Sequence, residues 1–167
     1  MRARQAGTMR EDDCELIREL YPSLRRFAAV VRPPEVEADD LLQEALYQAL
    51  RRGPLTGLAN PTAYLRRAMS NLAANHRRSL ARRRLALARH GPAEDPAPAY
   101  PSDVAELLRL PPRLRAALYM RAVEGRSYPE IAECLGCSEA AARAVEGRAR
   151  RKLRAALNEE EERDATA

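Results

Sequence analysis

Apolar residues recur at three- and four-residue spacing through most of the chain, and this period predicts helices. A first helix is expected over residues 12–31, where Pro22 would kink it or split it in two. A second helix is expected over about 36–51, and the segment 53–59 is predicted to be a loop. The first part of the chain is therefore predicted to be a small helical bundle.

The third predicted helix runs from Asn60 to about residue 84. Asn60 can act as its N-cap, and Pro61 fits the first turn because an N–H would have no partner there. Its buried stripe is expected at Leu65, Ala68, Met69 and Leu72. The opposite side carries arginines and asparagines, which suit gripping phosphate and reading bases. These residues are Arg66, Arg67, Asn71, Asn75, Arg77 and Arg78.

A helix-turn-helix pattern occupies residues 126–157. Ser127 and Glu130 predict a capping box at the start of the first helix. Gly136 stands where the chain must turn, because glycine takes positive φ without penalty, and Ser138 can cap the second helix. The second helix is strongly basic, with Arg143, Arg148, Arg150, Arg151, Lys152 and Arg154. Such a helix can enter the major groove of DNA; the alternative is a surface helix whose arginines are only solvated.

The two helical parts are separated by residues 90–102, which are rich in proline and alanine and show no apolar period. We therefore expect an all-α protein of two small helical domains joined by a flexible linker. The expected divisions are a disordered N-terminus (1–11), a first domain (12–89), the linker (90–102), a second domain (103–157) and an acidic flexible tail (158–167).

Charge is unevenly distributed along the chain. The net charge is +5, and ten arginines but no acidic residue occur between Ala45 and Ala93. A block of one sign repels itself unless a polyanion neutralises it, which favours nucleic-acid contact in this region.

Residues that could support catalysis or metal binding are sparse. Cys134 and Cys137 form a C-x-x-C pair, but no second pair or nearby histidine completes a zinc site, and small buried side chains are the favoured interpretation. His76 and His90 have no nearby nucleophile or carboxylate pair. We expect no enzyme activity, no metal and no cofactor. Since no apolar run approaches membrane-spanning length, we expect a cytoplasmic protein without a membrane partner.

Three stretches, in this order, resemble the extracytoplasmic-function (group 4) class of bacterial sigma factors, within the sigma-70 family. Residues 38–45 resemble the acidic D-L-V-Q-E helix of that class. Residues 60–73, with the arginines at 82–84, resemble the helix that melts and reads the −10 element. Residues 110–132 resemble the C-terminal domain that precedes the −35-reading helix. The resemblance covers roughly residues 12–157.

This resemblance implies a protein that binds core RNA polymerase and directs it to promoter DNA. The second helix would dock on the β′ coiled-coil, and the C-terminal domain would sit on the β flap. The docking residues would be Asp39, Asp40, Leu41, Leu42, Gln43 and Glu44. The −10 strand would contact Asn60, Arg67, Asn71, Asn75, Arg77 and Arg78, and the loop 53–59 would receive an unstacked base. The −35 duplex would meet Ser138, Glu139, Arg143, Arg148, Arg150 and Arg151.

The chain also departs from the family. Tyr64 stands where tryptophan is usual, and Ala141 and Ala144 replace bulkier or polar residues in the −35-reading helix. In the same helix, Glu146 is expected to repel phosphate, and Gly147 is expected to weaken the helix by roughly 1 kcal/mol relative to alanine.

Other functions remain open at this stage. A stand-alone helix-turn-helix repressor or activator would bind an operator without polymerase. A recombinase or nuclease would need a nucleophile or metal-binding carboxylates inside the basic block, which has none. A sigma-like protein without initiation activity would lack the acidic docking residues, which are present. The resemblance leaves an anti-sigma factor open as a further partner.

Overall fold

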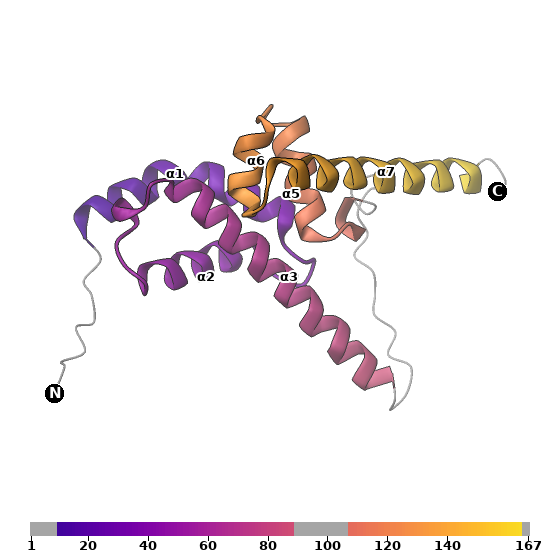
Figure 1. Cartoon of the computed structure of the whole chain (residues 1–167). Coiled ribbons are helices and arrows are strands. Elements are labelled where there is room, and N and C mark those ends of the chain that lie inside the picture. The colour runs from indigo at the N-terminus through magenta and orange to yellow at the C-terminus, as the bar shows by residue number, and fades with distance from the viewer. Residues whose placement is uncertain (1–9, 89–106, 165–167) are drawn as a thin grey trace.

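The computed structural model describes residues 10–88 and 107–164, and the regular structure in these two ranges is helical, with no strand. The expected all-α fold is confirmed (Figure 1). The elements of the first part are α1 (Glu11–Val31), α2 (Ala38–Leu50), the short 3-10 helix η1 (Leu55–Gly57) and α3 (Pro61–Ala88). Those of the second part are α5 (Pro112–Ala122), α6 (Tyr128–Leu135) and α7 (Glu139–Asp164). The expected linker and both chain ends lie outside the described residues.

The first helix is continuous through Pro22, so the predicted split does not occur. Pro22 is exposed, and so is Arg18, whose carbonyl loses its helical partner to the proline. Water can therefore satisfy that carbonyl, and the buried side of α1 continues without interruption. This side packs Leu24, Phe27 and Val31 against the other helices.

The first unit is a three-helix bundle of α1, α2 and α3, which all contact one another. Buried leucines and alanines of α2 face α1 and α3, and the N-cap predicted at Asn60 is present. Its Oδ1 accepts the amide of Ala63 at 3.0 Å. The connection that contains η1 is held by Asp13 of α1, whose Oδ1 accepts the Thr56 amide at 3.0 Å.

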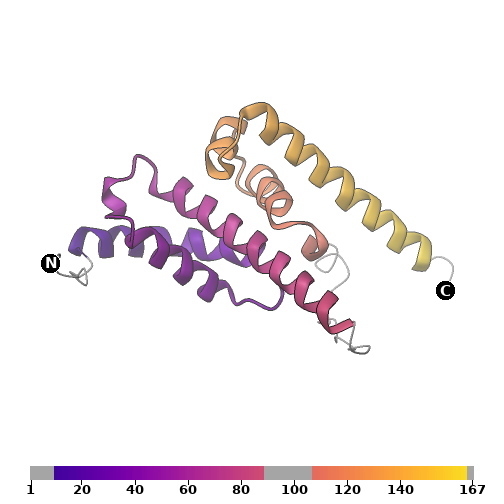
Figure 2. The same ribbon diagram turned by 60° about the horizontal axis from the view of Figure 1, so that its bottom comes forward.

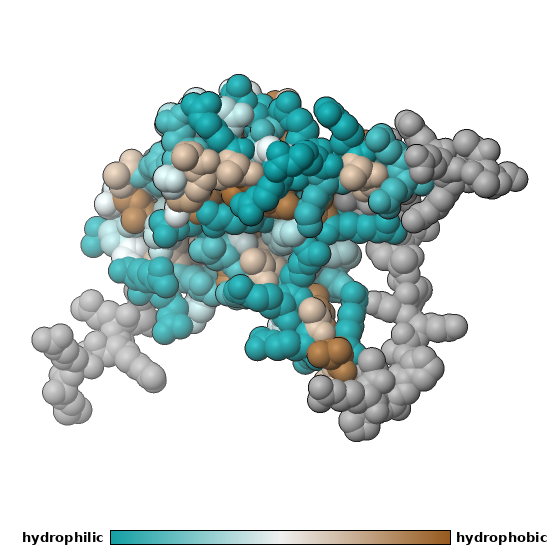
Figure 3. Space-filling model, turned by 45° about the vertical axis from the view of Figure 1, so that its right-hand side comes forward, coloured by the Kyte–Doolittle hydropathy of each residue, from teal (hydrophilic) through white to brown (hydrophobic). Residues whose placement is uncertain are grey.

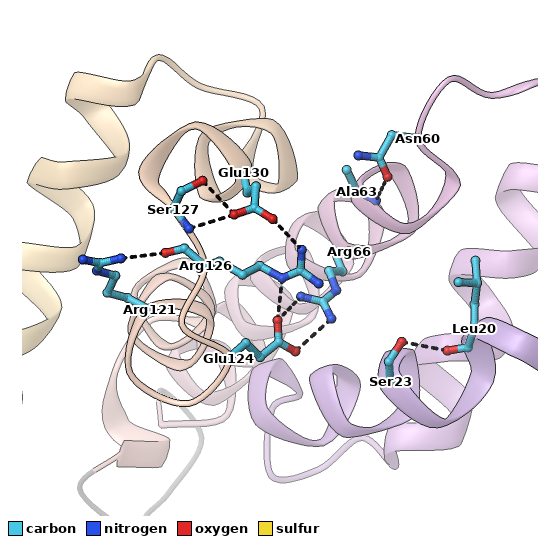
Figure 4. Close-up of polar contacts among 10 residues, drawn as sticks. All are labelled: Leu20, Ser23, Asn60, Ala63, Arg66, Arg121, Glu124, Arg126, Ser127 and Glu130. Carbon is cyan, nitrogen blue, oxygen red and sulfur yellow. Dashed lines mark hydrogen bonds and ion pairs between the residues drawn. The ribbon is translucent and has the colours of Figure 1, made fainter.

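The second unit contains the helix-turn-helix as predicted. The carboxylate of Glu130 accepts the amide of Ser127 at 2.8 Å and its hydroxyl at 2.7 Å (Figure 4). Gly136 ends α6 in the left-handed conformation, with φ 60° and ψ 49°. The hydroxyl of Ser138 then accepts the amide of Ala141 at 3.2 Å, which starts α7.

The two units are packed on each other. Helices α5 and α6 lie against α1 and α3, and buried side chains from both units form one continuous hydrophobic core. The turned view in Figure 2 shows that the C-terminal parts of α3 and α7 extend beyond this packed region as two separate arms. The face shown in Figure 3 is largely hydrophilic, and no helix of the described ranges is both long and apolar enough to cross a bilayer.

Helices α3 and α7 are both longer than expected. Helix α3 continues to Ala88, and α7 continues to Asp164, so the first residues of the expected flexible tail are helical. The added part of α3, residues 85–88, contains no proline or glycine, and α7 contains none after Gly147. Alanine, leucine, glutamate and arginine, which are frequent in these segments, are good helix formers. Local propensity therefore extends both helices past the last residues that pack on the core.

Candidate nucleic-acid interface

The basic outer face predicted on α3 is present only in part. Asn71, Asn75 and Arg78 are exposed, and Arg78 donates a hydrogen bond to the Asn75 side chain. Arg77 is also exposed and donates to the backbone oxygen of Arg109 at 3.1 Å. Asn60 is exposed at the start of the helix, but its side-chain oxygen is engaged in capping.

Arg66 was expected beside this face but is buried, with 1% of its side chain exposed. Its two terminal nitrogens bind the carboxylate of Glu124 at 2.5 and 2.8 Å, across the boundary between the two units (Figure 4). The guanidinium carbon also lies 5.0 Å from the centre of the Phe27 ring, as a cation–π contact. The expectation that Arg66 flanks the nucleic-acid face is therefore wrong in this arrangement.

The sequence does contain a signal for this second buried side of α3. Ser70 and Ala73 follow Arg66 at helical spacing and are also buried. Small residues in this register let α5 and α6 approach closely. Because the residues of this side are small or polar, the apolar stripe predicts only one buried side, whereas α3 is buried on two.

Arg67 is exposed but lies against the turn of the helix-turn-helix. A Cβ built on Gly136 would come within 2.9 Å of the Arg67 Cδ, and closer still to Nε and Cζ. Arg67 thus belongs to the face expected to contact the −10 strand, and it is packed against the unit expected to read the −35 element.

Arg115 of α5 is a second buried arginine at the boundary, and sequence reasoning did not single it out. Its Nη2 donates to the carbonyls of Val31 and Arg32, at the end of α1, at 2.9 and 2.8 Å. Burial, with repulsion from Arg77 and Arg32, lowers the pKa of Arg115 to about 10. The C-terminal end of a helix carries partial negative charge, which compensates part of this unfavourable burial.

The basic helix α7 presents the residues expected to meet the −35 duplex. Those predicted residues, namely Ser138, Glu139, Arg143, Arg148, Arg150 and Arg151, are all exposed. Arg143 is ion-paired with Glu139, and its guanidinium carbon lies 4.4 Å from the centre of the Tyr128 ring. Arg121 lies over the same ring at 4.9 Å. These contacts hold Arg143 in place at the N-terminal end of the helix, where recognition helices approach bases.

Glu146 does not face the predicted DNA surface. It is buried, and its Oε1 accepts hydrogen bonds from the Nη2 and Nε of Arg150 at 2.6 and 3.1 Å. The expectation that Glu146 repels phosphate is therefore wrong, because its carboxylate is buried and is neutralised by Arg150, one helical turn later.

The residues of α2 that are predicted to dock on polymerase (the docking edge) include both buried and exposed side chains. Leu41 and Leu42 are fully buried in the core, so these two are not available for docking and instead position the helix. Asp40 and Gln43 are exposed.

The other two carboxylates of this edge already have partners. Asp39 accepts Nε of Arg25 at 2.9 Å and the hydroxyl of Tyr21 at 2.7 Å, and these hydrogen bonds lower its pKa. Glu44 lies 3.0 Å from Nε2 of His76 and accepts the Gln48 amide at 3.3 Å. The freely accessible acid of the predicted docking edge is thus Asp40.

The cysteines do not form a metal site within the described ranges. Cys134 is buried and Cys137 half-buried, and both are free thiols. Burial raises the pKa of the Cys134 thiol, which opposes formation of the reactive thiolate. No group of three or more potential metal ligands occurs in the part of the chain that the structure describes.

Each of the two units matches the model of a known protein family. The model of sigma-70 region 2 matches residues 16–83, and the model of sigma-70 region 4 matches residues 104–153. Among curated proteins compared by sequence, none matches significantly. The chain therefore belongs to the sigma-70 family, as a sigma factor of the extracytoplasmic-function class.

Among solved structures, the chain is similar to the sigma factor RpoE of Bartonella quintana, crystallised in complex with the anti-sigma factor NepR. The sequences are 24% identical, the TM-score is 0.63, and the similarity covers 89% of this chain and 98% of that chain. At this identity the similarity supports the fold, including both helical units, and does not by itself transfer partners.

Proposed function

We propose that this protein binds core RNA polymerase and directs it to promoters by reading a −10 and a −35 element. The observation that carries the proposal is the presence of two differently built basic helices in one chain. Helix α3 exposes asparagines with arginines, which suits an unpaired strand, whereas α7 exposes arginines from a helix-turn-helix, which suits a duplex groove.

Two further features support the proposal. Asp40 and Gln43 form an exposed polar edge on α2, and this edge suits a basic surface of the polymerase β′ subunit. The loop 53–59 is anchored at buried Leu55 and by Asp13, while Thr56 and Gly57 remain exposed and able to receive an unstacked base.

Run-off transcription tests the proposal directly. Purified core polymerase is incubated with a genomic promoter library, with and without this protein, and the transcript starts are mapped. New discrete starts that share two upstream sequence elements are expected. The proposal fails if no starts appear while the protein alone binds duplex DNA tightly, and a stand-alone repressor or activator would then be the better assignment.

A further inference from the structure

Each unit contributes one buried arginine that binds an acceptor in the other unit. Arg66 of α3 reaches Glu124, which lies in the turn between α5 and α6, and Arg115 of α5 reaches the end of α1. The rings of Phe27 in α1 and Tyr119 in α5 also meet edge to face across the boundary, with centroids 6.4 Å apart. The predicted DNA-reading helices of both units therefore lie within one compact fold.

This compact fold does not fit the span of a promoter. Elements centred near −10 and −35 lie about 25 base pairs apart, which is on the order of 80 Å along a duplex at about 3.4 Å per base pair. In the structure, α3 is in direct contact with α6, the helix that supports α7. The two units must therefore separate before both elements can be read together.

Separation would leave the two members of the ion pair in different situations. The Glu124 carboxylate also accepts Nε of Arg126 at 2.7 Å, and Arg126 belongs to the same unit (Figure 4). Glu124 therefore keeps a cationic partner after opening. Within residues 10–88 and 107–164, Arg66 pairs with no carboxylate other than Glu124, and its Nε has no hydrogen-bond partner even in the closed fold.

Arg66 is also next in sequence to Arg67, on the helix proposed to contact the −10 strand. Once α5 and α6 move away, its guanidinium would join that basic face as an unpaired cation. A phosphate group accepts two parallel N–H bonds from arginine in the same way as the Glu124 carboxylate does. The two acceptors can thus replace each other at one site.

We propose that the Arg66–Glu124 pair is an interdomain latch: it keeps the protein closed, and on opening Arg66 exchanges the Glu124 carboxylate for a backbone phosphate of the promoter strand. The inference rests on the proposed function for the identity of that strand. It assigns Glu124 a role in regulating access, and Arg66 a second role in binding phosphate.

The closed state is tested on the full-length free protein, without polymerase or DNA. Dyes are attached to Gln48→Cys on α2 and Glu133→Cys on α6, with the three native cysteines changed to alanine. Energy transfer between the dyes then reports the separation of the two units. Glu124→Gln should raise the open fraction about tenfold or more, because it leaves the buried Arg66 charge unpaired.

Two further variants make this test specific. Glu35→Gln removes the same charge from the exposed Glu35–Arg84 pair, whose two members both lie in the first unit, and should leave energy transfer unchanged. Glu124→Arg should open the protein further, and combining it with Arg66→Glu should restore closure, because the reversed charges attract again. If Glu124→Gln and Glu124→Arg both keep the closed transfer efficiency while remaining folded by circular dichroism, the latch is refuted.

The exchange of partners is tested by binding to a single-stranded oligonucleotide of mixed sequence over a series of salt concentrations. Glu124→Gln should bind more tightly than the unaltered protein. Adding Arg66→Gln should weaken that binding and reduce the slope of log affinity against log salt by about 0.7, the loss expected for one phosphate contact on a single strand. An unchanged slope would show that Arg66 does not bind phosphate.

These tests separate the latch from the proposed function. Energy transfer and oligonucleotide binding involve no polymerase, so a failed latch leaves the run-off result standing. Conversely, an absence of new transcript starts together with a charge-dependent opening would retain the latch and reject the assignment as an active sigma factor.

Discussion

The side chain of Arg67 occupies the space in which a β-carbon on Gly136 would lie. The sequence suggests these two residues for unrelated reasons: Arg67 is predicted to contact nucleic acid, and Gly136 is predicted to end a helix. In the folded protein, the left-handed glycine both ends α6 and lets α3 approach the turn. The backbone angle requires the glycine, and the exposed Arg67 side chain fills the space that the missing β-carbon leaves.

Gly136→Ala should destabilise the protein slightly more than Gly125→Ala does, because the exposed Arg67 side chain must also move aside. Both glycines have positive φ, of 60° and 66°, so both substitutions should cost roughly 1–2 kcal/mol of backbone strain. Only Gly136 also faces Arg67, whereas a Cβ on Gly125 meets no atom within 4 Å. Urea unfolding measures the difference. Adding Arg67→Ala should remove the excess penalty at Gly136, and an excess that persists would contradict this explanation.

Asp13→Ala should loosen the loop 53–59. Asp13 is 2% exposed and accepts the backbone amide of Thr56, so its removal costs this hydrogen bond, about 0.5–1.5 kcal/mol, because water can bind the amide of the exposed Thr56 instead. Asp12→Ala is the matched control, because Asp12 is exposed in the same helical turn. Hydrogen exchange at the Thr56 amide should accelerate in the first variant only. Equal exchange in both variants would rule out the anchoring role.

Arg115→Lys should lower the free energy of unfolding by about 1–2 kcal/mol, because the lysine side chain is one atom shorter and its ammonium does not reach as far as the arginine Nη2, which donates to both the Val31 and the Arg32 carbonyl. Arg113→Lys, at a half-buried position of the same helix, should change stability by less than about 0.5 kcal/mol. Chemical denaturation of the two variants side by side provides the comparison. Similar losses in both would indicate that the carbonyl contacts contribute little.

The stability contributed by Glu124 should disappear in acid. Burial by itself would raise the pKa of Glu124, but hydrogen bonds from Arg66 and Arg126 outweigh burial and lower the pKa below its ordinary value of 4.5. The folded state therefore holds the proton more weakly than the unfolded chain does. The advantage of the unaltered protein over Glu124→Gln should be complete above pH 4.5 and decline as the pH falls through the lowered pKa. Unfolding curves measured from pH 6 to pH 3 test this, and an advantage that grows in acid would contradict it.

Asp40→Arg should reduce binding to core polymerase by at least about tenfold while leaving the fold intact, because Asp40 is exposed and its charge would be reversed at the proposed docking edge. Gln48→Arg, on an exposed part of the same helix, is the control for added positive charge. Binding is measured with labelled core enzyme. Duplex binding by α7 should be unchanged in both variants, and a loss of DNA binding in Asp40→Arg would point to misfolding instead.

Much of the local structure follows from short-range patterns. The caps at Asn60, Ser127 and Ser138 and the glycine at 136 are present as predicted, because each depends on atoms within four residues along the chain. The same holds for the basic character of α7. Of the two effects predicted for Pro22, the split does not occur, because the carbonyl that loses its partner lies on the side of α1 that meets solvent, and that side is set by the packing of α1.

What the sequence by itself determined is the helical composition, the order of the elements, the helix-turn-helix and the membership of the sigma-70 family. Only the tertiary structure decided which charged side chains are accessible. Arg66 is buried against Glu124, 58 residues away in the sequence, whereas the next residue, Arg67, is exposed, so two adjacent arginines take opposite environments. The physical reason is that burial of a charge depends on a partner brought from elsewhere in the chain, whereas a helix and its caps depend on near neighbours.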